Sequence, residues 1–272
     1  MSDAPLSVRN LSVKFRDPSA GAAVRNVSFE LRPGSVFGII GESGAGKSSL
    51  ALALMGLQDR RQVEVSGEVR YRGKNLQDLN EGELCKVRGS GIGMIFQDSM
   101  GALDPSMKVV DQLAEVIRIH QNAGRSESKR LAFQQLERVG IRENLLITAP
   151  HAYQLSGGLC QRAMIAMALA CNPDVLIADE PTSSLDLRLQ AQIIALLNEQ
   201  RRATGLSIVF ISHDLALVSR VADDVMVLHE GESVESGECS EILSNPSHAY
   251  TKGLVGIWKQ LGQQGGDAVA PA

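Results

Sequence analysis

The chain has 272 residues, of which 44% are hydrophobic and 21% are charged, and its formal net charge is −4. This length allows a large buried core in one domain, or in one domain with a smaller lobe. The composition is typical of a globular protein, and the net charge argues against a nucleic-acid partner because it offers no basic surface to a phosphate backbone.

The N-terminal part of the chain is rich in strand patterns. Asp3 is acidic and no apolar segment of signal-peptide length follows it, so the sequence does not predict export. Alternation of apolar and polar residues predicts strands at 6–15 and 23–31, which indicates an antiparallel start. The continuous apolar run at 35–40 is typical of a strand buried on both faces, and residues 47–57 have helical spacing.

The middle of the chain changes from strands to helices. Residues 65–76 alternate as a hairpin does, and residues 91–98 indicate another buried strand. Residues 107–140 then place apolar side chains at helical spacing on a polar surface. The longest apolar run, Ala163–Cys171, is shorter than the about 18 residues that a membrane span requires, so we expect the chain to remain in the cytoplasm.

Helices and apolar strands alternate in the second half of the chain. Such alternation predicts a parallel sheet that is covered by helices on both faces. The predicted strands are 174–179, 207–212 and 224–231, and the predicted helices are 161–171, 187–203 and 214–222. Residues 261–272 are rich in Gly, Gln and Ala and are expected to form a disordered tail.

The four cysteines give no sign of a metal site or a disulfide framework. They occupy positions 85, 160, 171 and 239, without any C-x-x-C pair. This spacing argues against a zinc site and against a disulfide framework. Each cysteine is therefore interpreted as an ordinary core or surface residue.

The stretch GESGAGKSSL, residues 41–50, interrupts the most hydrophobic region with small residues and one lysine. Gly41, Gly46, Lys47 and Ser48 fit the pattern G-x-x-x-x-G-K-[ST], between a predicted buried strand and a predicted helix. In that setting backbone N–H groups surround phosphate oxygens, Lys47 reaches the β- and γ-phosphates, and Ser48 can bind Mg²⁺. The alternative is a tight strand-to-helix turn with an incidental lysine, which the flanking pattern disfavours.

A second candidate element is DVLIADEPTSSLD, residues 174–186. Asp179 and Glu180 follow the apolar residues of a predicted strand, and open α/β sheets bind ligands at this carboxyl end. Asp179 would lie on the Mg²⁺ side, and Glu180 would orient or deprotonate an attacking water. Alternatively, the Asp-Glu-Pro sequence only starts a helix, with Pro181 in its first turn.

A third candidate element is LSGGLCQR, residues 155–162, directly before a predicted helix. Ser156 and the pair Gly157-Gly158 form a second helix N-terminus that suits an anion, and Arg162 lies one turn further on. Ser156 could alternatively act only as a helix cap. The presence of the other two elements favours the anion-binding interpretation.

With these three elements the chain resembles the nucleotide-binding subunits of ABC transporters over roughly residues 5–255. The resemblance implies an α/β P-loop NTPase of ABC type, with a mostly parallel sheet core, an antiparallel β-subdomain and a helical subdomain. It also implies one ATPase domain over residues 1–260, with the helical subdomain inserted at about 98–165. The matching motifs are Walker A at Gly41–Ser48, the Q-loop at Gln97, the signature at Leu155–Leu159, Walker B at Val175–Asp179, the D-loop at Ser183–Asp186 and the switch histidine His213.

The resemblance implies ATP and Mg²⁺ as ligands and assigns roles to single residues. The catalytic residues would be Glu180, His213 and Gln97. The nucleotide would be bound by Phe15, Gly41, Ser43, Gly44, Gly46, Lys47, Ser48 and Ser49, and Mg²⁺ by Ser48, Gln97 and Asp179. Phe15 would stack on adenine, although the sequence alone equally allows it a place in a strand core. The other histidines, at 120, 151, 229 and 248, are interpreted as surface or structural residues.

The family arrangement further implies two such subunits that enclose two ATP molecules. The residues that would serve the nucleotide of the partner are the signature residues Leu155, Ser156, Gly157 and Gly158, with Asp186 in the D-loop. The implied partners are a second ATPase subunit, two membrane-spanning permease subunits and an extracytoplasmic substrate-binding protein. The chain would lie peripherally on the cytoplasmic face of the bacterial inner membrane.

Within the family, the chain resembles the importer branch for oligopeptides, dipeptides and nickel. The segments that carry this similarity are MIFQDSMGALDPSM and NPSHAYTKGLVG, in which Ala249 replaces the proline of the branch. Leu159 stands where the family usually has glutamine, and an apolar residue is common there in this branch. The segment around Ala249 is alternatively only the start of an amphipathic helix. The shortness of the C-terminus looks more like nickel or metallophore importers.

The sequence therefore predicts the ATP-hydrolysing subunit of an importer for peptides or for nickel and metal chelates. One alternative is a non-transport ABC ATPase of the translation or repair type, although 114 residues separate Walker A from the signature without sustained heptads, since 155 − 41 = 114. Another is a regulatory nucleotide-binding module without turnover, against which Glu180 and His213 argue.

Overall fold

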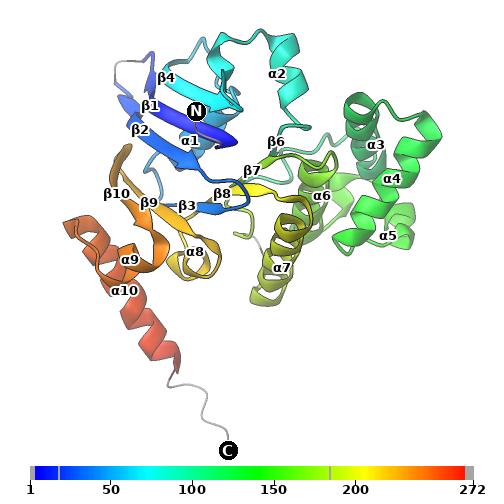
Figure 1. Cartoon of the computed structure of the whole chain (residues 1–272). Helices are drawn as coiled ribbons and strands as arrows, with labels where there is room; N and C mark the ends of the chain where they lie inside the picture. Colours follow the sequence, from blue (N-terminus) through cyan, green and yellow to red (C-terminus); the bar gives the residue numbers. More distant parts are fainter. Residues whose placement is uncertain (1–3, 18, 184, 267–272) are drawn as a thin grey trace, which may run out of the picture. The chain divides into compact units, whose positions relative to one another are not determined.

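The computed structural model describes residues 4–17, 19–183 and 185–266, which form two compact units. Figure 1 shows the helices and strands of both in chain order. Each unit contains part of the predicted site. Unit 1 comprises Met1–Leu6, Leu31–Ser35 and Arg70–Val209, and unit 2 comprises Ser7–Glu30, Val36–Val69 and Phe210–Ala272.

Unit 2 contains a sheet that is built from the N-terminal strands. β1 (Leu6–Phe15) and β2 (Ala22–Leu31) confirm the two strands predicted there, and β4 (Val63–Tyr71) lies on the other side of β1. The approach of β4 to β1 is close, because a Cβ on Gly67 would stand 2.3 Å from the carbonyl oxygen of Asn10. Gly67 therefore cannot carry a side chain without a shift of one of the two strands.

A second sheet of unit 2 leads into the glycine-rich loop. β3 (Val36–Ile40) is buried throughout, as predicted, and pairs in parallel with β9 (Asp224–His229), where Ile40 lies opposite Val227. β10 (Glu232–Glu238) pairs with β9 in antiparallel and has no counterpart among the predicted strands. Because β3 and β9 are parallel, their carboxyl ends lie at one edge, where α/β sheets bind ligands.

Helices of unit 2 cover these strands. α1 (Lys47–Leu54) begins directly after the glycine-rich loop and buries Leu50 and Leu54, in agreement with the predicted helix. α8 (Leu215–Val221) contacts β3, and α9 (Cys239–Ser244) contacts β9 and β10. α8 and α9 therefore lie against the sheet that carries the loop.

The last helix, α10 (Ala249–Gly266), starts in the segment NPSHAYTKGLVG and contacts α8 and β10. The backbone of residues 261–266, part of the predicted disordered tail, continues this helix. Residues 267–272 lie outside the described residues. A helix therefore starts in the segment around Ala249.

Unit 1 contains the strand that precedes the predicted Q-loop and the strand that forms the predicted Walker B. β6 (Ile92–Ile95) and β7 (Val175–Asp179) are buried throughout and pair in parallel, with Ile95 opposite Ala178. β8 (Ser207–Ser212) begins in this unit, where the Ser207 N–H donates to the Asp174 carbonyl at 2.9 Å. These strands confirm the predicted buried strands of this region.

The predicted hairpin is formed by β4 and the short β5 (Lys74–Asn75), which pair in antiparallel. The Tyr71 hydroxyl at the end of β4 hydrogen-bonds to the Asp174 carboxylate, and Arg72 forms an ion pair with the same carboxylate at 2.7 Å. Burial and the neighbouring carboxylate raise the pKa of Tyr71, so the phenol keeps its proton. The hairpin is thereby attached to the start of β7.

Helices form most of the remainder of unit 1. The predicted helical region 107–140 consists of α3 (Val109–Gln121) and α4 (Arg125–Arg138), which contact each other and α6 (Gly157–Leu169). The break between α3 and α4 follows Asn122, whose φ of 52° is left-handed and ends α3. The other helical elements are α2 (Glu81–Val87), α5 (Glu143–Thr148), α7 (Leu187–Thr204) and the 3₁₀ turns η1 (Leu76–Asp78) and η2 (Ala152–Gln154).

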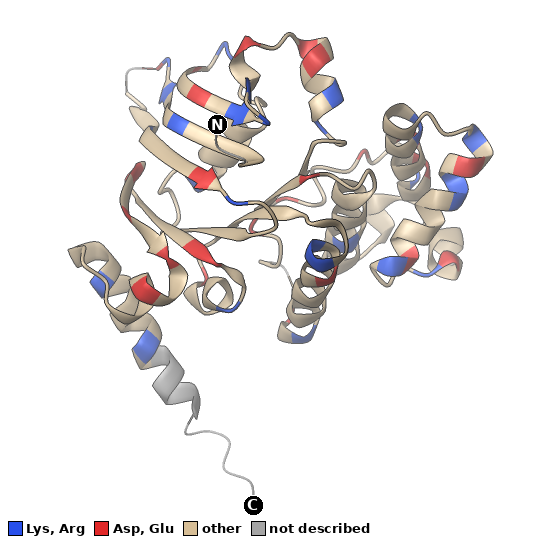
Figure 2. Ribbon diagram, in the orientation of Figure 1, with Lys and Arg blue, Asp and Glu red and all other residues tan. Residues whose placement is uncertain are grey.

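Charges of both signs are interspersed along the ribbon of each unit (Figure 2). This distribution agrees with the small net charge of −4. Among the helices of the described residues, none combines the length and the apolar character that a bilayer crossing requires.

Candidate functional site

The glycine-rich loop of unit 2 runs from the end of β3 to the start of α1, as the sequence predicts. Gly46 has a φ of 99°, and a Cβ there would stand 2.0 Å from the carbonyl oxygen of Ala23. A Cβ on Gly41 would stand 2.2 Å from the carbonyl oxygen of Leu228. Glycine is thus required at both positions by the neighbouring backbone as well as by the curvature of the loop.

Lys47 is folded back onto the loop. Its ammonium group donates to the carbonyl oxygens of Gly41 and Glu42 at 2.8 and 2.9 Å, and only 8% of the residue is exposed. Ser43, Gly44 and Ser48 are exposed, and Ser49 is half-buried. The charge of the lysine is therefore held beside a loop whose hydroxyl groups and backbone face solvent, as phosphate binding requires.

The predicted switch histidine lies near this loop within unit 2. A cavity of about 470 Å³ is lined by Gly41, Glu42 and Ser43 on one side and by His213 on another. His213 is exposed and follows β8 directly, while the next residue, Asp214, caps α8 by accepting from the N–H groups of Ala216 and Leu217 at 2.8 and 3.2 Å. The cap fixes the turn that presents His213 to the cavity.

Phe15 is the last residue of β1 and is half-buried, so it is not part of the strand core. Its backbone N–H donates to the Gly21 carbonyl at 3.0 Å, which closes the turn between β1 and β2. An aromatic ring with an accessible face is what stacking on a base requires. The structure is therefore compatible with the predicted adenine contact.

Unit 1 brings the predicted Q-loop and Walker B residues to one edge. Ile95 and Ala178 are opposite each other in the parallel pair β6–β7, so Gln97 and Asp179 both follow the paired residues at the carboxyl end. Gln97 is exposed, whereas Asp179 and Glu180 are 3% and 5% exposed. Buried carboxylates are uncommon in proteins, so two of them at this edge mark it as a candidate site.

The backbone at Glu180 has a left-handed φ of 49°. Non-glycine residues rarely adopt this conformation, and such residues gather at functional sites, where the surrounding structure holds them. Part of that support comes from Ser183, whose backbone N–H and hydroxyl donate to the Glu180 carbonyl at 3.3 and 3.2 Å. The conformation turns the chain sharply after β7, and this sets the direction of the Glu180 side chain.

A further support of this turn, Gln161 in α6, escaped the sequence analysis. Its side-chain amide is 1% exposed and donates to the carbonyl oxygen of Pro181 at 2.8 Å. The donor comes from the predicted signature helix and the acceptor from the residue after Glu180. The sequence carried no signal for this contact, because Gln161 lies beside Arg162 and before the apolar run that starts at Ala163.

The signature residues begin α6. The Ser156 hydroxyl caps the helix by accepting from the Leu159 N–H at 3.4 Å, so the alternative structural role of this serine is present. Ser156 and Gly157 are exposed, and no atom lies within 4 Å of a Cβ built on Gly157. Leu155, in contrast, is buried. The N-terminus of α6 therefore presents an open backbone surface that suits an anion.

Asp186 of the predicted D-loop is exposed and caps α7, where its carboxylate accepts from the Leu189 N–H at 2.9 Å. The neighbouring Gly158 packs closely, because a Cβ there would stand 3.2 Å from the Leu185 side chain. Residue 184 of the D-loop lies outside the described residues. Within unit 1, the D-loop thus contacts the signature helix.

The predicted residues fall into two groups, one in each unit. Unit 2 contains Phe15, the loop 41–49 and His213, and unit 1 contains Gln97, the signature, Asp179, Glu180 and Asp186. The predicted Mg²⁺ ligands Ser48, Gln97 and Asp179 supply a hydroxyl, an amide and a carboxylate oxygen, a donor set that suits Mg²⁺. Among the described residues, no cluster of three or more His, Cys, Asp or Glu side chains is arranged to hold a metal.

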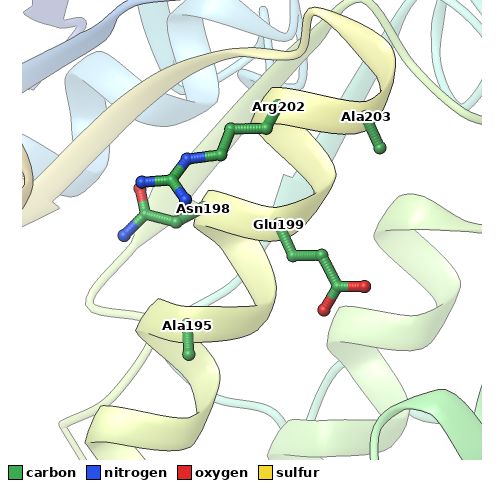
Figure 3. A pocket seen from close by; sticks show the side chains of 5 residues that line it. All are labelled: Ala195, Asn198, Glu199, Arg202 and Ala203. Atoms are coloured by element: carbon green, nitrogen blue, oxygen red, sulfur yellow. The ribbon is translucent and has the colours of Figure 1, made fainter.

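A separate hollow lies on α7 (Figure 3). Its lining residues are Ala195, Asn198, Glu199, Arg202 and Ala203. In Figure 3 the side chains of Asn198 and Arg202 point toward each other, and Glu199 points to the other side of the helix. All five residues come from one helix and none belongs to the predicted site.

Comparisons with known proteins give a consistent picture. The model of the ABC transporter family matches residues 24–183. The glutathione import ATP-binding proteins GsiA of Shigella flexneri and of Escherichia coli (strain K12) are each 43% identical over 268 residues, which cover 96% of this chain and 43% of the relative. The chain thus spans less than half the length of these curated relatives.

Two solved structures have the same fold. One is the dimeric post-hydrolysis state of an ATP-binding cassette bound to ADP and Pi, and the other is a dimeric bacterial ABC transporter cassette. Each has a TM-score of 0.76 and 28% sequence identity, and the match covers 86% of this chain and 98% of that chain. The predicted fold class is therefore confirmed. With a family match over more than half of its residues and the fold of an ATP-binding cassette, the chain belongs to the ABC transporter family.

Proposed function

We propose that this chain is the ATP-hydrolysing subunit of a bacterial ABC importer whose substrate is a small peptide. The observation that carries the proposal is the position of Asp179 and Glu180, buried at the carboxyl end of β7 beside the strand that leads to Gln97. An active phosphoryl-transfer site needs such carboxylates, and a nucleotide sensor does not. The chain-wide similarity to glutathione import ATP-binding proteins supports the transport role.

Lys47 and the loop around it would bind the phosphates of ATP. The lysine is already held by the Gly41 and Glu42 carbonyl oxygens, so less conformational entropy is lost when it contacts a phosphate. The loop N–H groups and the N-terminus of α1 add positive potential. Phe15 would stack on the base.

Mg²⁺ would be held by Ser48, Gln97 and Asp179, and it would supply charge neutralisation at the phosphates. Glu180 would orient the attacking water and accept its proton, since a buried carboxylate is a strong candidate for a general base. His213 would contact the γ-phosphate. The left-handed backbone at Glu180 supports this role, because it holds the side chain in one direction.

The exposed N-terminus of α6 supports the proposal that a second ATPase subunit takes part in the reaction. Ser156 and Gly157 lie open to solvent and would cover a nucleotide bound to a second ATPase subunit. Two permease subunits and an extracytoplasmic substrate-binding protein would complete the importer, with this chain on the cytoplasmic face of the membrane. Asp186, at the start of α7, would lie at the same interface.

Glutathione import, named for the relatives, favours a short peptide as the transported substrate over nickel or a metal chelate. A translation or repair ATPase fits less well, because the relatives that match 96% of this chain are named as import proteins. A regulatory module without turnover does not need the buried Glu180.

Uptake in cells that lack this chain tests the proposal. The cells receive the wild type, Lys47→Ala, or the matched control Lys74→Ala, whose lysine is exposed in β5. Labelled glutathione, a labelled dipeptide and labelled nickel are supplied in parallel. We expect the wild type and Lys74→Ala to restore uptake of a peptide, and Lys47→Ala to restore none.

Restoration of nickel uptake alone would replace the peptide by a metal as the substrate. Equal restoration by Lys47→Ala would contradict ATP-driven transport by this chain. If no uptake is restored but the purified chain hydrolyses ATP, the result would favour a non-transport ATPase of the translation or repair type.

A further inference from the structure

The start of α10, within the segment NPSHAYTKGLVG, contacts the glycine-rich loop. The Glu42 backbone N–H donates to the Tyr250 hydroxyl, with 3.3 Å between nitrogen and oxygen. Both residues belong to unit 2, although 208 positions separate them in the chain. The C-terminal helix therefore reaches the loop proposed to bind phosphate.

Tyr250 and Lys47 hold the two ends of one peptide group. The Gly41–Glu42 peptide donates its N–H to the Tyr250 hydroxyl and accepts the Lys47 ammonium at its carbonyl oxygen, 2.8 Å away. A hydrogen bond at one end of a peptide group limits its rotation, and rotation would turn the carbonyl away from the lysine. The hydroxyl is thus coupled to the position of the lysine ammonium through a single rigid group.

Tyr250 is itself fixed by neighbours in β9 and β10. Its ring stacks on the His229 ring with 3.8 Å between centroids and 24° between planes. The Glu235 carboxylate accepts from the backbone N–H groups of Ser247 and His248 at 2.6 and 3.1 Å, and so anchors the start of the helix. His229, interpreted from the sequence as a surface or structural residue, is therefore part of the support of the loop.

The loop is also held by β9 and by the turn after it. The Gly231 N–H donates to the Ala45 carbonyl at 3.1 Å, and Gly41 packs on the Leu228 backbone. These contacts fix the two flanks of the loop, whereas Tyr250 is the contact that acts on the peptide next to the lysine. The hydroxyl of Tyr250 therefore has a role that the neighbouring contacts do not duplicate.

We propose that Tyr250 is a positioning residue for Lys47, through which the C-terminal helix pre-organises the loop for nucleotide phosphates. The proposal rests on the proposed binding of ATP by this loop. Pre-organisation lowers the free-energy cost of binding, so loss of the hydroxyl weakens nucleotide affinity without removal of any nucleotide contact. By thermodynamic linkage, bound nucleotide in turn strengthens the attachment of α10.

The chain contains its own probe for this linkage. Trp258, the single tryptophan of the sequence, lies in α10 and lines the cavity together with Gly41, Glu42 and Ser43. Tryptophan emission depends on the surroundings of the ring, so Trp258 reports changes in the cavity that α10 and the loop line. Nucleotide binding is therefore expected to change Trp258 emission in the wild type, with a smaller change when the hydroxyl is absent.

The test compares Tyr250→Phe with the matched control Tyr153→Phe. Tyr250→Phe removes the hydroxyl and keeps the ring on His229, while Tyr153 is an exposed tyrosine of unit 1. Purified chains are titrated with magnesium ADP by calorimetry and by Trp258 fluorescence. One lost hydrogen bond predicts a Kd about threefold to tenfold higher for Tyr250→Phe and an unchanged Kd for Tyr153→Phe.

Two further readouts separate positioning from a merely structural role. In the assembled transporter, Tyr250→Phe should raise the KM for ATP by the same factor and leave kcat within about twofold. The midpoint of thermal unfolding should fall by no more than about 4 °C. A larger fall, with loss of helix content, would assign Tyr250 to the attachment of α10 alone and overturn the proposal.

The outcomes distinguish this inference from the proposed function. If the wild type fails to bind magnesium ADP, the nucleotide-binding role of the loop is wrong. If the wild type binds and Tyr250→Phe binds equally well, the nucleotide-binding role stands and Tyr250 does not position Lys47.

Discussion

The Gln161 side chain donates a hydrogen bond to the carbonyl oxygen of Pro181 at 2.8 Å, with both partners buried. The bond joins the helix that begins with the signature to the residue that follows Glu180. A change at either end of this bond therefore reaches the other. The proposed general base and the proposed partner-facing helix are connected by one amide.

Gln161→Leu tests this connection. The substitution leaves the Pro181 carbonyl buried without this donor, which costs about 1–3 kcal/mol in the free energy of unfolding. We also expect kcat of the assembled transporter to fall about tenfold, because the turn that directs Glu180 loosens. Urea unfolding and steady-state hydrolysis measure the two effects.

A matched control is Gln121→Leu, which removes an amide-to-carbonyl bond of 2.9 Å to Ala170. This bond is partly exposed and ends at Ala170, the C-cap of α6, and not on the turn after β7, so the control should lose less stability and keep its kcat. Equal kcat for Gln161→Leu and wild type would show that the amide is structural only.

Glu180→Gln preserves the shape of the side chain and removes its ability to accept a proton. We expect nucleotide affinity within about twofold of wild type and a kcat lower by a factor of about 100 or more. Phosphate release by the assembled complex and calorimetric titration of the chain check both values. Glu199→Gln, an exposed change on α7, is the control and should leave kcat unchanged. Undiminished hydrolysis by Glu180→Gln would remove the base assignment.

Three glycine substitutions should rank by backbone geometry. Gly46→Ala combines a φ of 99° with a Cβ 2.0 Å from the Ala23 carbonyl oxygen, so we expect a loss of at least about 3 kcal/mol. Gly44→Ala has a φ of 84° in open space, which predicts about 1–2 kcal/mol. Gly157→Ala meets neither obstacle and should change the free energy of unfolding by less than about 0.5 kcal/mol.

Denaturant unfolding of the three variants gives the ranking. A Gly46→Ala protein as stable as the wild type would contradict the close contact between the Ala23 carbonyl oxygen and Gly46. A large loss for Gly157→Ala would show that the N-terminus of α6 is not open.

Acid should weaken the attachment of α10. Burial raises the pKa of Glu235, but the backbone N–H groups of Ser247 and His248 that donate to its carboxylate outweigh this effect, so the pKa is lowered overall. A carboxylate whose pKa is lower in the folded state than in the unfolded state stabilises the fold at pH values above the unfolded-state pKa, which is about 4.3 for Glu. This stabilisation is lost as the pH falls through the folded-state pKa.

The free energy of unfolding of wild type minus that of Glu235→Gln measures this contribution. We expect the difference to be constant above about pH 5.5 and to shrink as the pH falls below about 4.3. Glu232→Gln, an exposed neighbour paired with Arg25, is the control. A difference that does not depend on pH would contradict the role of the Glu235 carboxylate in the anchor.

The elements that the sequence predicted correctly are those whose signal lies within one short stretch. The loop at Gly41–Ser48 is recognisable because its strand, its glycines and the start of its helix are contiguous, and the same holds for Asp179 at the end of β7. Strands such as β3 and β7 were predictable because burial on both faces requires a continuous apolar run. β10 was missed because it lies at the edge of its sheet and is largely exposed, so its residues need not be apolar.

Contacts between distant parts of the chain had no such local signal. Neither the contact of Tyr250 with Glu42 nor that of Gln161 with Pro181 follows from a spacing, because chain folding alone brings these residues together. The local pattern of residues was sufficient to predict the strand, the glycine-rich turn and the helix of the proposed phosphate-binding loop. The support of that loop by His229, Tyr250 and Glu235 depended on the packing of α10 against β9 and β10, since side chains far apart in the chain meet only when the strands and helices between them are in place.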